Sequence, residues 1–154
     1  MNSYAAPTLR EGAHHYACRV YFEDTDAAGV VYYANYLKLA ERARTEALRD
    51  LGVPHAELLA NHGLMFMVRR AKLDYLHPAR LDDLLVVATR PQAIGAASVE
   101  LRQTFHRAGD AARLVVADIL LACVRRSDTR AARMPARWRD ALAGLLGPGQ
   151  PGTG

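Results

Sequence analysis

The sequence predicts an α+β domain in which a five-stranded antiparallel sheet wraps around one long central helix, with a short helix near the C-terminus. Two observations lead to this fold class. The apolar patterning gives the order strand, long helix and then four strands, and the later strands follow one another through short polar turns. Strands joined by short turns run antiparallel. A sheet with one apolar face needs a covering layer, which only the long helix is large enough to supply.

The first strand and the long helix are predicted from their periodicity. Residues 15–23 alternate, and the apolar side chains of this strand share one face: Tyr16, Cys18, Val20 and Phe22. The helix is predicted over residues 31–51, where small and apolar side chains recur at spacings of three and four. They are Tyr36, Ala40, Ala43, Ala47 and Leu51. Gly52 and Pro54 stand where a helix C-terminus is expected.

The second half of the chain is predicted to supply the rest of the sheet. A short helix near residues 55–60 precedes four strands, over residues 64–76, 84–90, 97–107 and 114–126. The run Ala108-Gly109-Asp110 is typical of a hairpin turn between the last two strands. Pro135 opens a short final helix, which carries Trp138, Leu142 and Leu145 on one side.

Composition indicates a single globular domain. We expect a flexible lead over residues 1–13, one domain over residues 14–146 and a disordered tail over residues 147–154, which read GPGQPGTG. Hydrophobic residues make up 51% of the chain and charged residues 23%, as in ordinary globular proteins. The formal charge of +4 is a mild excess that suits an anionic ligand and is too small to indicate a nucleic-acid partner.

Cysteine usage and hydropathy bear on the cellular compartment. Cys18 and Cys123 each lie in an apolar run and form no CxxC pair, so buried reduced thiols are expected. No apolar stretch approaches the roughly 18 residues that span a bilayer, and residues 1–13 contain no hydrophobic signal core. We therefore expect a cytoplasmic protein without stable membrane insertion.

An acidic turn immediately before the long helix carries the most specific motif. The run Asp24-Thr25-Asp26-Ala27-Ala28-Gly29-Val30-Val31-Tyr32-Tyr33-Ala34-Asn35-Tyr36 resembles the active-site segment of the 4-hydroxybenzoyl-CoA thioesterase family of hot-dog proteins. Three flanking segments, over residues 19–23, 41–46 and 78–83, resemble one branch of that family, the Tol-Pal-system-associated acyl-CoA thioesterases. The resemblance extends from residue 19 to residue 135 and implies the hot-dog fold.

The resemblance also implies a thioester hydrolase that acts on acyl-CoA or on an acyl carrier protein. In that family the residue matching Asp26 is the catalytic carboxylate, and the backbone amide matching Tyr33 polarises the thioester carbonyl. A carboxylate serves as nucleophile or general base. Amides at a helix N-terminus lack partners inside the helix and are able to stabilise an oxyanion. Helix capping is the alternative interpretation of Asp26, although Asp24 fits a capping or turn role better.

Tyr33 departs from the branch, which usually has histidine at this position, so only the role of the backbone amide is carried over. A functional side chain and a packed aromatic ring remain alternatives for Tyr33. The expected substrate-binding residues are Gly29, Val31, Tyr32, Arg126 and Arg130. Glycine lets a backbone approach a ligand closely, and arginine suits the phosphates of coenzyme A. A solvated charged face is the competing interpretation of the two arginines.

Other chemistries find little support in the sequence. The six histidines show no metal-ligand spacing, and the sequence lacks a GxSxG elbow and a P-loop. We therefore expect no metal and no other cofactor. Two rival functions stay open: a hot-dog dehydratase or hydratase, and a non-catalytic acyl-thioester-binding or scaffold protein. The absence of histidine between Asp24 and Tyr36 disfavours the lyases, which generally need histidine to move a proton.

The predicted sheet also bears on assembly. Its exposed edge invites pairing, and the nearly continuous apolar run over residues 114–124 is typical of a strand buried on both faces. We expect a homo-oligomer, a dimer or a tetramer, as the resemblance also implies. The alternative is a monomer in which the C-terminal helix covers the second face of the sheet.

Overall fold

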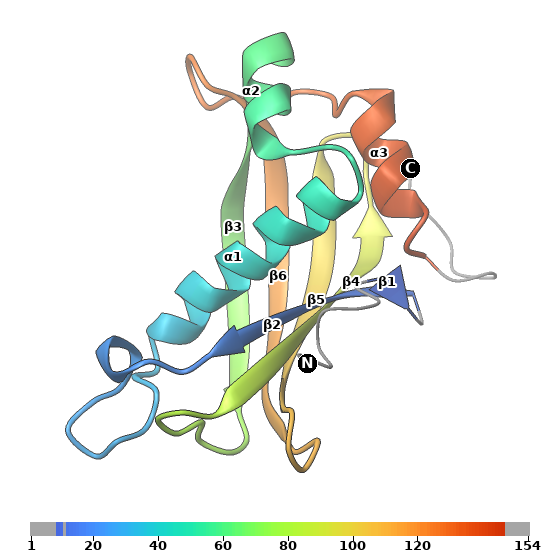
Figure 1. The fold of residues 1–154 in the computed structure, drawn as a ribbon. Coiled ribbons are helices and arrows are strands. Elements are labelled where there is room, and N and C mark those ends of the chain that lie inside the picture. Colours follow the sequence, from blue (N-terminus) through green and yellow to red (C-terminus); the bar gives the residue numbers. More distant parts are fainter. Residues whose placement is uncertain (1–8, 11, 147–154) are drawn as a thin grey trace.

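The computed structural model describes residues 9–10 and 12–146. These residues form one six-stranded antiparallel sheet in the order β1-β2-β4-β5-β6-β3, with the long helix lying across one face (Figure 1). The predicted hot-dog architecture is confirmed, and a two-residue strand, β1 (Leu9–Arg10), adds to the five predicted ones. Most of the expected lead and all of the expected tail fall outside the described residues.

The other strands follow the prediction with shifted ends. They are β2 (Ala13–Arg19), β3 (Leu64–Tyr75), β4 (Leu84–Ile94), β5 (Ser98–Arg107) and β6 (Arg113–Arg125). The prediction for the first strand ran too far, because Phe22–Asp24 form a 3-10 helix, η1. In this turn Asp24 Oδ2 accepts the backbone amide of Tyr21 (2.8 Å). β4 instead continues past its predicted end and through Pro91, where its register with β5 shifts.

Helix α1 (Asn35–Asp50) begins later than predicted. Residues 31–34 are not helical, because Val31 pairs with Thr25 in an isolated β-bridge and its amide donates to the Ala79 carbonyl (2.8 Å). The apolar face of the helix is confirmed, and its buried side chains are Tyr36, Leu39, Ala40, Ala43, Ala47 and Leu48. This face packs on the sheet, where the Tyr36 ring meets Phe105 of β5 edge to face (5.4 Å between centroids).

Helices α2 (His55–His62) and α3 (Ala136–Ala143) pack on the same side of the sheet as α1 (Figure 1). One apolar cluster joins Leu48 of α1, Leu58 of α2 and Trp138 of α3 to the sheet. The Trp138 indole donates to the Val53 carbonyl (3.0 Å), which pairs its one polar atom in a buried position. The C-terminal helix therefore does not cover the second face of the sheet.

The second face of the sheet is polar. Arg102 of β5 and Asp118 of β6 form an ion pair across it (2.8 Å). The middle of β6 alternates between buried Ala117 and Ile119 and half-buried Asp118, so within one chain this part of the strand is buried on one face only, and burial of the second face stays a prediction about the oligomer. β3 lies at one edge of the sheet and pairs with β6 alone in the described part of the chain. No helix among the described residues is long and apolar enough to cross a membrane.

Candidate active site

The acidic turn between η1 and α1 is closed by its own hydrogen bonds. The Asp26 amide donates to the Val30 carbonyl (2.9 Å), and the Asp26 carbonyl accepts the Gly29 amide (3.0 Å). Gly29 has a φ of +76°, a left-handed conformation that glycine adopts without strain. This tight turn holds the Asp26 side chain on the surface.

The Asp26 carboxylate keeps one oxygen free. Its Oδ1 accepts the backbone amide of Ala28 (2.9 Å), which orients the side chain. Its Oδ2 accepts no hydrogen bond from residues 9–10 or 12–146. A carboxylate that is oriented through one oxygen and open at the other is able to take a proton from water or to attack a carbonyl carbon.

Asp24 has the turn role that the sequence analysis expects. Its side chain is 6% exposed, and Oδ2 accepts the Tyr21 amide (2.8 Å). Its carbonyl accepts the Tyr32 amide (3.0 Å) and the side-chain amide of Asn35 (2.8 Å), the first residue of α1. Asp24 therefore ties the turn to the helix, which leaves Asp26 as the accessible one of these two aspartates. No group of three or more His, Cys, Asp or Glu residues in the described chain is arranged to hold a metal ion.

The backbone amide of Tyr33 lies just before α1, whose N-cap is Ala34. Among the described residues nothing accepts a hydrogen bond from this amide, whereas the Tyr33 carbonyl accepts the Tyr75 hydroxyl (3.2 Å). Amides at this end of a helix carry partial positive charge, so a free one polarises a bound carbonyl. The Tyr33 ring is exposed and contacts the Tyr32 ring (4.7 Å between centroids).

An open cleft of about 270 Å³ adjoins Tyr33. Its walls are mostly apolar or aromatic: Val31, Tyr33, Tyr36, Tyr75, Leu76, His77 and Pro78. The Tyr36 and Tyr75 rings meet edge to face (5.7 Å between centroids), which gives the cleft a rigid aromatic wall. Sequence reasoning missed His77, because it lies far from the acidic motif in the chain and reaches the cleft from the end of β3.

Three of the predicted substrate-binding residues, Gly29, Val31 and Tyr32, share the loop of Asp26 and Tyr33. Val31 is buried and lines the cleft, whereas Tyr32 is exposed beside Tyr33. A Cβ atom at Gly29 would meet no heavy atom within 4 Å, so the chain leaves open space there. The loop thus combines a carboxylate, a free amide and room for a ligand.

Arg126 and Arg130 lie at the far end of β3 and β6 from this loop. The Arg126 amide donates to the carbonyl that precedes Leu64, at the start of β3, whereas Tyr75 at the end of β3 contacts Tyr33. At about 3.3 Å per residue, the two ends of β3 are about 36 Å apart. A single chain therefore does not bring these arginines to the acidic turn.

A second cavity, here called the inner cavity, has a volume of about 90 Å³ and lies between α1, α3 and the sheet. Its apolar lining consists of Ala47, Leu48, Phe66, Val68, Pro91, Val99, Leu101, Leu121, Leu142 and Leu145. Its polar residues are Glu41, Arg44, His55 and Thr89. Burial lowers the pKa of His55, and the nearby Arg44 charge lowers it further, so the imidazole is neutral near pH 7.

Residues 20–142 match the thioesterase-like superfamily. The acyl-CoA thioesterase YbgC of Haemophilus influenzae is 44% identical over 106 residues, which cover 69% of this chain and 76% of that protein. The 1,4-dihydroxy-2-naphthoyl-CoA hydrolase of Thermosynechococcus vestitus is 37% identical over 94 residues, 61% of this chain and 64% of that protein. The crystal structure of a probable thioesterase from Bartonella henselae has a TM-score of 0.75 and 33% identity, over 80% of this chain and 99% of that chain. With the acidic turn, α1 and most of the sheet inside the matched residues, this chain belongs to the thioesterase-like superfamily of hot-dog proteins.

Proposed function

We propose that the protein is an acyl-CoA thioesterase in which Asp26 is the general base or nucleophile and the Tyr33 amide polarises the carbonyl. The observation that carries this proposal is the presence of a free Asp26 oxygen and a free Tyr33 amide on one short loop beside an apolar cleft. The relatives named for acyl-CoA and 1,4-dihydroxy-2-naphthoyl-CoA hydrolysis support the substrate class.

The loop supports two routes for thioester hydrolysis. In the general-base route, Asp26 takes a proton from a water molecule whose oxygen attacks the carbonyl carbon. The carbonyl oxygen becomes an oxyanion that accepts a hydrogen bond from the Tyr33 amide. The carbon–sulfur bond then breaks, and the thiolate of coenzyme A takes the proton from Asp26. In the nucleophilic route, Asp26 attacks the carbonyl carbon itself, and the carbon–sulfur bond breaks to release the thiolate of coenzyme A and leave an anhydride. Water then hydrolyses the anhydride to the free acid and the Asp26 carboxyl group, whose proton passes to the thiolate.

The working unit is a homodimer formed through the free edge of β3. A long exposed strand edge invites pairing with another chain, and two identical edges related by a two-fold axis run antiparallel. This pairing brings Tyr75 of one chain near Leu64 of the partner subunit. The turn that carries Arg126 and Arg130 then lies beside the partner's acidic turn, where the two arginines meet the phosphates of coenzyme A.

The family branch, the oligomer, the cellular compartment and the carrier of the acyl group are proposed from the resemblance and from residue chemistry. The protein belongs to the Tol-Pal-associated branch, and its dimers associate into tetramers. Cys18 and Cys123 are free thiols, which suits a reducing cytoplasm. An acyl carrier protein presents the same thioester on the same kind of arm and is the alternative carrier of the acyl group.

The inner cavity supports a short acyl group. Phe66 and Val68 of β3 line this cavity, so in the dimer it lies close to the partner's acidic turn. An apolar cavity of about 90 Å³ is small for a palmitoyl chain. We expect acyl-CoA thioesters with shorter acyl groups to be hydrolysed faster than palmitoyl-CoA.

The test is hydrolysis of a panel of acyl-CoA thioesters, with detection of the free thiol. Asp26→Asn should lower kcat by about 100-fold or more, because the amide keeps the shape of the carboxylate and loses its basicity. Asp24→Asn is the matched control, since its side-chain oxygen still accepts the Tyr21 amide, and its effect should be mild. Circular dichroism checks that both variants fold. Equal and small effects of the two changes would sink the assignment of Asp26.

The same experiment separates the rival functions. A non-catalytic acyl-thioester-binding protein would bind acyl-CoA and release no thiol. A dehydratase or hydratase would interconvert 3-hydroxyacyl-CoA and 2-enoyl-CoA, a reaction followed by the absorbance of the enoyl thioester. The position of His77 on the cleft wall is the observation that keeps this second candidate in the test.

A further inference from the structure

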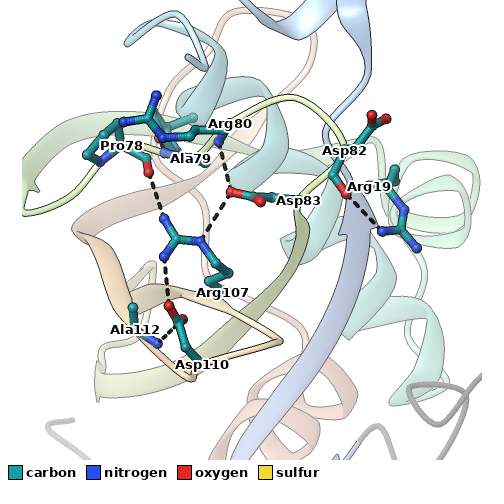
Figure 2. A network of polar contacts seen from close by, with 10 residues as sticks. Arg19, Pro78, Ala79, Arg80, Asp82, Asp83, Arg107, Asp110 and Ala112 are labelled. Carbon is teal, nitrogen blue, oxygen red and sulfur yellow. Dashed lines mark hydrogen bonds and ion pairs between the residues drawn. The ribbon is translucent and has the colours of Figure 1, made fainter. Parts of the chain in front are cut away.

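We propose that Arg107, at the end of β5, is a positioning residue for the acidic turn, although it lies far from the catalytic motif in the sequence. This proposal rests on the proposed function of Asp26 and Tyr33. Figure 2 shows the Arg107 guanidinium between the loop over residues 78–83 and the β5–β6 hairpin, with hydrogen bonds to both. The loop over residues 78–83, here called the support loop, in turn bonds to the backbone of the acidic turn.

Each nitrogen of the Arg107 guanidinium has its own acceptor. Nη2 donates to the Pro78 carbonyl (3.0 Å) and Nε donates to Asp83 Oδ2 (3.2 Å), at the two ends of the support loop. Nη1 donates to Asp110 Oδ2 (2.9 Å) in the hairpin, which fixes the guanidinium from the other side. Lysine, with one ammonium on a flexible stem, does not reproduce this planar fork.

Asp83 connects the hydrogen bonds of Arg107, here called the clamp, to the backbone of the support loop. Its Oδ2 also accepts the Arg80 amide (2.9 Å), so one oxygen joins Arg107 to the loop backbone. Asp82 has a φ of +71°, a left-handed conformation that a non-glycine residue keeps only where its surroundings hold it. Arg19 of β2 donates to the Asp82 carbonyl (2.9 Å), as Figure 2 also shows. Arginines from two strands therefore contact the support loop, in addition to the backbone hydrogen bonds that join Asp82 and Asp83 to Val20.

The support loop carries the acidic turn through backbone hydrogen bonds. The Val31 amide donates to the Ala79 carbonyl (2.8 Å), and the Leu81 amide donates to the Gly29 carbonyl (3.3 Å). Both contacts fall between Asp26 and Tyr33 in the chain. A shift of the support loop therefore moves the carboxylate relative to the amide that must act on the same thioester carbonyl.

The clamp affects the position of the acidic turn more than the folding stability of the protein. The exposed fractions of Arg107, Asp83 and Asp110 are 26%, 22% and 58%, and ion pairs this accessible to water contribute little to folding. The catalytic rate is more sensitive than folding stability to the loss of these contacts, because a displacement of about 1 Å in a catalytic group lowers a rate by about 100-fold. Loss of the guanidinium should therefore lower kcat while the protein stays folded.

The test compares Arg107→Ala with Arg102→Ala in the full chain. Arg102 is a matched control, because it is an ion-paired arginine of the same strand whose partner, Asp118, lies on the polar face. We expect Arg107→Ala to lower kcat about 10-fold or more with a change in KM below about threefold, and Arg102→Ala to change neither. Guanidinium chloride at low millimolar concentration should restore part of the lost rate. Arg107→Lys, which keeps the charge without the fork, should fall between Arg107→Ala and the wild type.

Hydrogen exchange provides a readout that does not depend on activity. The Val31 amide should exchange faster in Arg107→Ala and at the wild-type rate in Arg102→Ala. Unchanged kcat and unchanged Val31 exchange in Arg107→Ala would overturn the proposal, as would a loss of rate that only follows a loss of folded protein. A wild type that releases no thiol would instead refute the proposed function. An active wild type, an inactive Asp26→Asn and a fully active Arg107→Ala would refute the positioning role alone.

Discussion

A mixed-dimer experiment distinguishes a site built across two chains from a site built within one. In the proposed dimer, each site takes Asp26 from one chain and Arg126 with Arg130 from the other. One preparation carries Asp26→Asn, and the second carries both Arg126→Ala and Arg130→Ala. A mixed dimer then has one site with all three residues intact and one site in which all three are changed.

The expected rate of the mixed preparation follows from the number of intact active sites. Random exchange of equal amounts gives about half mixed dimers, each with one intact site of two, and hence about 25% of the wild-type rate. Each parent variant alone should hydrolyse the thioester far more slowly than the mixed preparation. Asp26→Asn should lose about 100-fold in rate. Each arginine lost from a phosphate costs roughly 1.5 to 3 kcal/mol, on the order of 10- to 100-fold in kcat/KM.

The assay measures thiol release at low acyl-CoA concentration after the two preparations are unfolded together in urea and refolded. Native mass spectrometry establishes that mixed dimers have formed, and wild-type protein taken through the same cycle sets the full rate. A rate near a quarter of that value supports the shared site. If mixed dimers form and the rate stays at the mean of the two parents, the placement of the arginines opposite the partner's Asp26 is wrong.

Two other residues carry predictions of their own. Tyr33→Phe and Tyr33→Ala should keep much of the activity, because the proposed donor is the backbone amide; a loss in Tyr33→Phe as deep as that in Asp26→Asn would show that the hydroxyl is essential. Burial, with the nearby Asp24 charge, raises the pKa of the Cys18 thiol from 9.0 to about 11. The folded protein thus keeps a proton that the unfolded chain releases, so stability present below pH 9 is lost as the pH rises to 11, by about 1.4 kcal/mol per pH unit. Urea unfolding at pH 8 and pH 10 checks this prediction, since the wild type should lose more stability than Cys18→Ala, and equal losses would contradict it.

The start of α1 shows where local patterning stops being informative. Tyr32 lies four residues before Tyr36 and continues the apolar face of the helix, and the predicted helix accordingly began near residue 31. In the structure the Val31 amide donates to the Ala79 carbonyl, and the Tyr32 amide donates to the Asp24 carbonyl. These partners lie outside the helix, and no periodicity in the segment itself encodes them. The helix therefore begins at Asn35, although its buried face was predictable.

The candidate site also combines features that the sequence indicates with features that only the fold reveals. Asp26, Gly29 and Tyr33 could be proposed from the sequence because they lie in one contiguous run, whose motif is specific and whose residue types suit the chemistry; their roles stay predictions. Strand order was not predictable, since β3 precedes β4 in the chain and yet pairs with β6. The inner cavity and the contacts of Arg107 join residues from several elements, so each becomes visible only after the strands are placed.

The division of roles between Asp24 and Asp26 follows from burial, because the residue type is the same. Asp24 is 6% exposed, and the Tyr21 amide offsets the cost of burying its carboxylate, so its use as a base would break the turn. Asp26 is exposed, and water competes for its free oxygen until a bound substrate excludes that water. The described residues of one chain leave Asp26 uncovered, so in the proposed dimer this exclusion comes from the thioester and from the second chain. In the proposed dimer, the second chain therefore contributes to catalysis by helping to exclude water from Asp26.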